Sequence, residues 1–214
     1  MRTAVFLCFA PFLVHAQTLQ VLDRIAVTVD QEVIAESDII RFLRVAAFLD
    51  DKPVDLSGPS KRTAATALVD QALILMDASD SHITLLSPQE IPPMLQQVKT
   101  QYPTEEAYQA ALKKYGITEQ DVENHLQSGV RALRFADLRF RPEVQISDQD
   151  LHAAYDKFVA EWRTTHKEPP ASFDQNRANL EQLLTNQRTT QALDQWLETQ
   201  RMQRHVDYRE DVFR

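Results

Sequence analysis

The chain of 214 residues carries 43% hydrophobic residues and a formal net charge of −8, which suits one or two domains with a sizeable core. The acidic charge repels phosphates and disfavours nucleic acid as a partner, while the three glycines, Gly58, Gly116 and Gly129, leave no glycine-rich phosphate loop and no GxSxG elbow. Nucleotide-binding and α/β-hydrolase functions are therefore disfavoured, and a helical protein, which needs few glycines, is favoured.

Residues 1–16 have the pattern of a secretory signal peptide. An uncharged apolar stretch follows Arg2, and the tripeptide that ends at Ala16 suits cleavage after that residue. The stretch is shorter than the ~20 residues of a membrane-spanning helix, so we expect an exported protein without stable membrane insertion. Cleavage removes Cys8, the only cysteine, and with it any disulfide or Cys-based metal site.

Two segments predict strands near the ends of the mature chain. The β-branched runs 24–29 and 32–36 flank the polar pair at 30–31 and predict a hairpin. Residues 206–208 alternate like a further strand. Because a lone strand needs a sheet, we expect both ends of the chain to meet in a small antiparallel sheet.

Helical periodicity between these strands predicts about six helices. Most begin with a capping residue, and Gly116 is expected to end one of them in the left-handed conformation. The start signals stand at Ser37, Ser60, Ser87, Pro103, Thr118, Ser147 and Phe173. The expected fold is therefore mainly α with a small antiparallel sheet.

The candidate catalytic and metal-binding groups are weak. Asp148, His152 and Asp156 share one helix face, but such faces are more often solvated charge pairs than metal ligands. Glu119, Asp121 and Glu123 resemble paired catalytic carboxylates, but they lie in the first turns of a predicted helix, where negative charge is favoured anyway. We expect no catalytic, metal-binding or cofactor-binding residues.

Four segments resemble, in the same order, parts of SurA-type periplasmic chaperones. Residues 23–38 resemble the opening hairpin and the Glu-Ser-Asp that begins the first helix, and residues 67–75 resemble the second helix. Residues 108–118 resemble the turn before the long helix, and residues 193–208 resemble the C-terminal helix and last strand. The similarity covers nearly the whole mature chain.

The resemblance implies a SurA-like chaperone domain over residues 17–214. Its N-terminal part, 17–142, is joined by a helix over 147–166 to a C-terminal helix and strand over 172–214. Typical members carry one or two Gly-rich parvulin-type prolyl isomerase domains before the C-terminal helix. Here the interval 140–173 holds one expected helix and no Gly, so the resemblance is to the chaperone core without the isomerase domain.

The expected function is that of an ATP-independent periplasmic chaperone. Its partners are unfolded or nascent exported polypeptides, outer-membrane proteins included, bound in an apolar groove. The candidate client contacts are Phe42, Phe48, Met94, Tyr102, Tyr108, Phe158 and Trp162. Two alternatives stay open: a prolyl cis-trans isomerase of the SurA/parvulin family and a structural envelope-assembly subunit. A monomer and a swapped dimer are both compatible with the sequence.

Overall fold

The computed structural model describes residues 23–87 and 89–214, so the predicted signal peptide lies outside the described residues. Within them the fold is mainly α, as predicted, with seven α-helices where about six were expected, and one three-stranded sheet. The helices are α1 (Glu36–Leu49), α2 (Gly58–Asp80), α3 (Ile91–Lys99), α4 (Glu105–Tyr115), α5 (Glu119–Arg139), α6 (Asp148–Thr165) and α7 (Phe173–Gln203). The strands are β1 (Ile25–Val29), β2 (Glu32–Ala35) and β3 (Val206–Tyr208), and the short 3₁₀ helices are η1 (Arg141–Glu143) and η2 (Glu210–Phe213).

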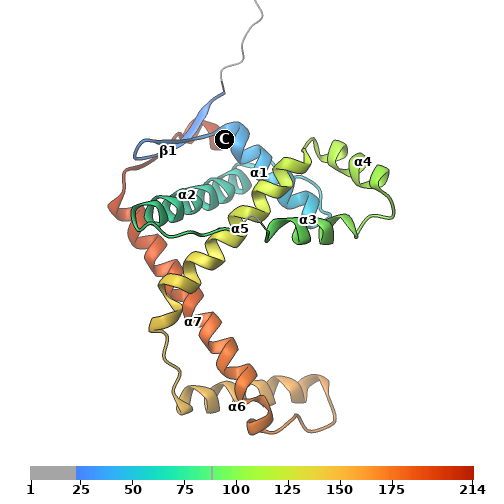
Figure 1. Ribbon diagram of the computed structural model, residues 1–214, viewed down its shortest axis with the longest axis vertical. Coiled ribbons are helices and arrows are strands. Elements are labelled where there is room, and N and C mark those ends of the chain that lie inside the picture. The colour runs from blue at the N-terminus through green and yellow to red at the C-terminus, as the bar shows by residue number, and fades with distance from the viewer. Residues whose placement is uncertain (1–22, 88) are drawn as a thin grey trace, which may run out of the picture.

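The two ends of the chain meet in the sheet, as the sequence predicts (Figure 1). Its strand order is β2-β1-β3, and β1 is antiparallel to both neighbours. The hairpin turn holds Asp30 at a φ of 52°, a left-handed conformation that Asp tolerates better than most residues. The Asp30 carboxylate accepts hydrogen bonds from Arg204 Nη1 at 3.0 Å and from the His205 backbone N–H at 3.1 Å. These bonds, that of Arg204 first, hold the pKa of Asp30 below its usual value and tie the hairpin to the C-terminal segment.

Three of the predicted helix ends are confirmed. The hydroxyl groups of Thr118 and Ser147 each accept a hydrogen bond at 3.2 Å from the backbone N–H three residues later, and so cap α5 and α6. Gly116 has a φ of 65° and ends α4 in the left-handed conformation.

Three other predicted starts are wrong by a few residues. Helices α1 and α2 begin earlier than expected, so Ser37 and Ser60 lie inside them rather than at their caps. Their hydroxyl groups bind the carboxylates of Asp23 and Asp55 instead of the helix backbone. Helix α3 begins later, after a turn in which the Ser87 backbone N–H donates to the Glu90 carboxylate at 2.8 Å. For Ser37 and Ser60, a nearby carboxylate thus competes with the helix backbone for the serine hydroxyl.

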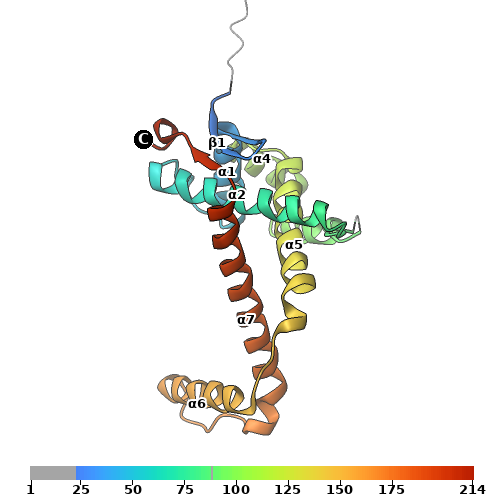
Figure 2. The same ribbon diagram turned by 90° about the vertical axis from the view of Figure 1, so that its left-hand side faces the viewer.

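Helix α6 and residues 173–188 of α7 form an arm that extends away from the other described residues, which we call the body (Figures 1 and 2). The arm has a small core: Leu151 and Leu180 are its buried aliphatic side chains. The His152 ring stacks on Phe173 with centroids 4.1 Å apart. Along the chain, the connection between α5 and α7 consists of η1, α6 and short loops.

Two hydrophobic clusters form the body. The larger lies between the sheet, α1, α2, α5 and the C-terminal half of α7, where Phe135 is fully buried beside Trp196. The smaller lies between α1, α3, α4 and α5 and is built around Phe48. Helix α1 packs against α2, α4 and α5, and one of its faces lines a surface groove between α2 and α5.

Candidate functional site

An apolar groove with a volume of about 310 Å³ opens where β2 meets α1, α2 and α5; we call it the β2 groove. Strand β2 contributes Glu32, Val33 and Ile34. Each helix contributes one stripe with the spacing i, i+3, i+4, i+7, which places four side chains on a single helix face. The stripes are Asp38, Arg41, Phe42 and Val45 of α1, Leu68, Gln71, Ala72 and Leu75 of α2, and Asp121, Asn124, His125 and Ser128 of α5.

Two further hollows continue the β2 groove along α2. One, of about 420 Å³, runs toward Asp80 and Arg204 at the end of α2. The other lies between α2 and α5 beside Ala132. Leu75 lines all three hollows and is 44% exposed, so it lies at the centre of one continuous surface.

The floor of the β2 groove combines aliphatic and aromatic side chains. The rings of Phe42 and His125 have centroids 5.0 Å apart. Burial lowers the pKa of His125, because removal from water disfavours the charged imidazolium. Val33 is 52% exposed at the rim of the groove. The floor is therefore apolar. Its one histidine takes up a proton only at a lower pH than a histidine in water does.

Charged groups of mainly negative sign surround this floor. Three carboxylates, those of Glu32, Asp38 and Asp121, face one guanidinium, that of Arg41. Arg41 lies 2.9 Å from Asp38 Oδ1 and 3.3 Å from Asp121 Oδ1, so it is shared between them. Glu32 forms no ion pair with any residue in 23–87 or 89–214. The rim therefore favours a partner with positive charge.

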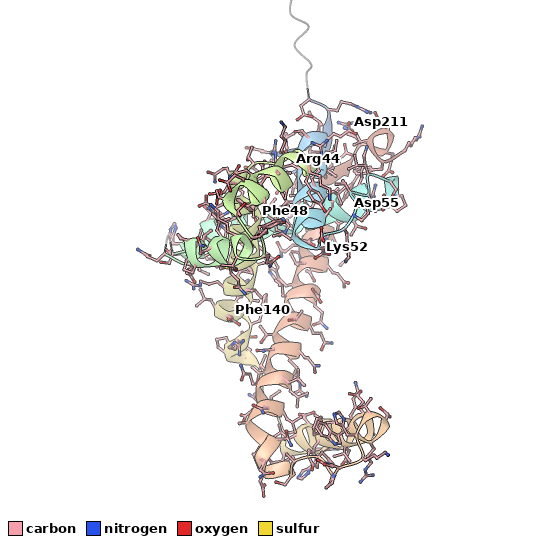
Figure 3. The ribbon with its side chains drawn as sticks, turned by 90° about the vertical axis from the view of Figure 1, so that its right-hand side faces the viewer. Arg44, Phe48, Lys52, Asp55, Phe140 and Asp211 are labelled. Atoms are coloured by element: carbon pink, nitrogen blue, oxygen red, sulfur yellow. The ribbon has the colours of Figure 1, made fainter. Side chains whose placement is uncertain are left out.

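Two of the predicted client contacts are wrong. Phe48 is 2% exposed and Tyr108 is fully buried, so neither reaches the surface. Figure 3 shows Phe48 inside the body. Its ring stacks on Tyr102 at 5.8 Å between centroids and meets Tyr108 edge-on at 6.1 Å, because these faces of α1 and α4 pack together. Half-buried Tyr102 belongs to the same aromatic cluster and lies outside the β2 groove.

Phe42 is the one predicted contact that lines the β2 groove. Met94 is 37% exposed on α3, away from the groove. Phe158 and Trp162 are half-buried on α6 in the arm, where the Trp162 indole N–H donates to the Glu168 carbonyl at 2.8 Å. The structure thus places the seven predicted side chains in four separate regions rather than on one surface.

Sequence reasoning missed Val33, Leu75 and His125. The predicted contacts are mainly aromatic, whereas the exposed groove residues are mainly aliphatic. Leu75 belongs to the apolar stripe that predicts the second helix, but a stripe does not show which of its members lacks a covering neighbour. Three helices and a strand have to be positioned before that becomes visible.

In the described part of the chain, the candidate metal-binding and catalytic carboxylates do not assemble into a site. Asp148 pairs with Arg177 at 2.6 Å, and Glu119 pairs with Lys99 at 2.6 Å. Residues 23–87 and 89–214 contain no group of three His, Cys, Asp or Glu side chains placed to hold a metal ion. Nor does this part of the chain contain a helix long and apolar enough to cross a membrane.

Comparison with known proteins adds no relative to this description. A scan against models of protein families finds no match for this chain. A search of curated proteins finds no match either. The function is therefore inferred from the residues and surfaces of the chain itself.

Proposed function

We propose that this chain is an ATP-independent periplasmic chaperone that holds unfolded exported polypeptides, outer-membrane proteins among them, in the β2 groove. The observation that carries the proposal is an open apolar floor with exposed Leu75, which has exposed Val33 at its rim and is bordered by carboxylates. Hollows with an apolar floor and a few polar groups at the rim are typical of binding sites. The resemblance of the ordered sequence segments to SurA-type chaperone cores supports the same function.

The floor suits a partner that offers apolar side chains without a fixed shape. A Val, Leu or Phe side chain of the client that becomes fully buried there contributes about 1.5–3 kcal/mol. Met76, which lines the extension of the groove along α2, adapts to different neighbours because its side chain is flexible. The carboxylates at the rim stay in water and keep the complex soluble.

An aggregation assay tests the proposal. An unfolded outer-membrane protein is diluted out of urea, and light scattering is followed with and without an equimolar amount of this protein. We expect the wild type to suppress scattering in the absence of ATP. Leu75→Glu places a charge on the apolar floor and should lose most of the suppression. Leu133→Glu is the matched control, because Leu133 is 71% exposed on α5 outside the groove.

The result that would overturn the proposal is scattering that the wild type leaves unchanged. Equal loss in Leu75→Glu and Leu133→Glu would remove the assignment to the β2 groove. The proposal includes no prolyl isomerase step, since η1, α6 and short loops form the whole connection between α5 and α7. In a proline-peptide assay we therefore expect the uncatalysed rate.

A further inference from the structure

We propose that the client occupies the β2 groove as an extended strand that pairs with the free edge of β2. This inference rests on the proposed function and specifies how the polypeptide is held. The occupant is an extended polypeptide segment with apolar residues at alternate positions and Lys or Arg between them. Four observations support it: the position of β2 in the sheet, the direction of one backbone amide, the apolar floor and the charge of the rim.

Strand β2 is an edge strand whose edge faces the groove. The order β2-β1-β3 leaves β2 with one neighbour. Glu32, Val33 and Ile34 are consecutive, and all three line the groove. Successive side chains of a strand point to opposite faces, so a hollow over one face would touch alternate residues only. Contact with three residues in a row places the groove along the edge itself.

The backbone groups of Val33 point toward the groove. The Ala26 carbonyl accepts from the Arg209 N–H, and the Asp30 N–H donates to the His205 carbonyl, both at 2.9 Å. These two residues of β1 therefore face β3. Because successive residues direct their backbone groups to opposite neighbours, Val27 and Val29 face β2.

The register between β1 and β2 then fixes the direction in which the backbone groups of each β2 residue point. Val27 pairs with Ile34 and Val29 pairs with Glu32, so these two residues of β2 point back to β1. Val33 lies between them, and its N–H and C=O point outward. No hydrogen bond joins the Val33 backbone to a described residue outside the sheet. An unpaired edge of this kind is a template for a further strand.

The neighbouring edge groups limit where a client can pair. The Ala35 N–H already donates to the Asp38 carboxylate at 3.0 Å, which leaves Val33 as the free residue of β2. A client strand therefore makes two hydrogen bonds to Val33. The client residues on either side of that pair point to the same face as Ile34, which is the face toward the helices. Their side chains then meet the floor at Phe42 and Leu75.

Charge favours a basic client strand. The rim of the β2 groove has three carboxylates and one guanidinium, and Glu32 stands at the start of β2 without an ion pair among the described residues. Arg41 is already shared by two carboxylates, so it offers little to an acidic client. Lys or Arg between the apolar residues of the client points to the face of Val33, opposite to that of Glu32, so the net negative charge of the rim attracts it across the strand within a Debye length of about 10 Å.

A labelled peptide tests this mode of binding. The probe is a short fluorescein-labelled peptide that alternates Val or Phe with Lys, and its dissociation constant is measured by fluorescence anisotropy. Val33→Pro removes the outward N–H and should weaken binding by about tenfold or more, since a hydrogen bond contributes about 1 kcal/mol and the ring obstructs its partner strand. Val206→Pro is the matched control, because by the same alternation its N–H points outward from the opposite edge strand, β3.

Three results separate this inference from the proposed function. Weak binding by Val33→Pro with wild-type binding by Val206→Pro supports strand pairing. Unchanged binding by Val33→Pro, together with loss in Leu75→Glu, overturns strand pairing and leaves the chaperone function intact. No binding of the peptide or of an unfolded outer-membrane protein by the wild type overturns both.

A second measurement keeps the inference testable if Val33→Pro does not fold. Hydrogen exchange of the Val33 amide is followed in the wild-type protein, with and without the same peptide. Protection of this amide on binding is the expected result, and unchanged exchange at saturating peptide overturns strand pairing. The peptide with Glu in place of Lys should bind about twofold to fivefold more weakly, because the rim carries net negative charge, and equal binding would overturn the role assigned to the rim.

Discussion

Gly58 and Gly129 show how much a single methyl group changes at different places in this fold. A Cβ on Gly58 would collide with the carbonyl oxygen of Phe213 in η2, whereas a Cβ on Gly129 would meet nothing within 4 Å. Gly58 lies at the start of α2, and its lack of a side chain lets the C-terminal turn pack against the helix. Gly129 lies inside α5, where glycine costs conformational entropy without any gain in packing.

We predict opposite effects for the two alanine variants. Gly58→Ala should lower the free energy of unfolding by about 1–3 kcal/mol, because η2 has to move away. Gly129→Ala should raise it by about 0.5–1 kcal/mol, because alanine has the higher helix propensity. Urea unfolding curves measure both, and a stable Gly58→Ala variant would contradict the packing of η2 on α2.

His125 is the residue of the β2 groove whose burial links the stability of the fold to pH. Its folded pKa is lowered by burial, so the unfolded chain binds the proton at higher pH than the folded chain does. The stability that depends on neutral His125 is thus complete above the unfolded pKa of about 6.5 and decreases as the pH falls below it. Glu32, Asp38, Arg41 and Asp121 line the same groove, but burial is the cause of the shift.

We predict that the stability of the wild type depends on pH more strongly than that of His125→Gln. Between about pH 7.5 and pH 5.5, the wild type should lose more stability than His125→Gln, which has no group to protonate there. The urea midpoint at each pH measures this difference. Parallel profiles for the two proteins would show that His125 is not held in an apolar environment.

Among the elements, the arm has the smallest core. Leu151 and Leu180 are its buried aliphatic residues, and Arg188 pairs with Asp150 at 2.7 Å where α6 begins. Most of the apolar surface that stabilises the fold lies in the body instead. We therefore expect the arm to open locally without unfolding of the body.

Leu180→Ala should show that the arm opens without unfolding of the body. Removing a buried leucine costs about 2–5 kcal/mol, which exceeds what a two-helix arm can supply from so few contacts. Hydrogen exchange should become fast in α6 and in residues 173–188 and stay unchanged in α2 and α5. Leu183→Ala is the control, because Leu183 is 50% exposed on the same helix. Faster exchange throughout the body would show that arm and body unfold as one unit.

The elements were predicted well where the signal was local. Thr118 and Ser147 cap their helices because each bonds to a residue three positions away, and such spacing is visible in the sequence. Ser37 and Ser60 carry the same signal but bind Asp23 and Asp55. Asp23 lies 14 residues before Ser37, so this contact forms only once the hairpin has folded back to bring the two together.

For the molecule as a whole, the body positions the groove and the sheet joins the two ends of the chain. The sequence predicted that the termini meet, because a strand at 206–208 has only one sheet to join. It did not predict the groove, since Leu75 and Val33 look like ordinary core residues until α1, α2 and α5 are placed around them. Conversely, Phe48 and Tyr108 look suited to bind a client but are needed to hold α1 and α4 together.

The most direct test of whether the β2 groove holds the client is site-specific photo-cross-linking to a defined client. A photoreactive amino acid replaces Leu75 in the β2 groove or, in a matched protein, Leu133 on the exposed face of α5. Each protein is mixed with one purified, unfolded outer-membrane protein and irradiated. If the client lies in the β2 groove, we expect strong cross-links from position 75 and few from position 133. Equal cross-linking from both positions, or stronger cross-linking from position 133, would contradict the claim that the β2 groove holds the client.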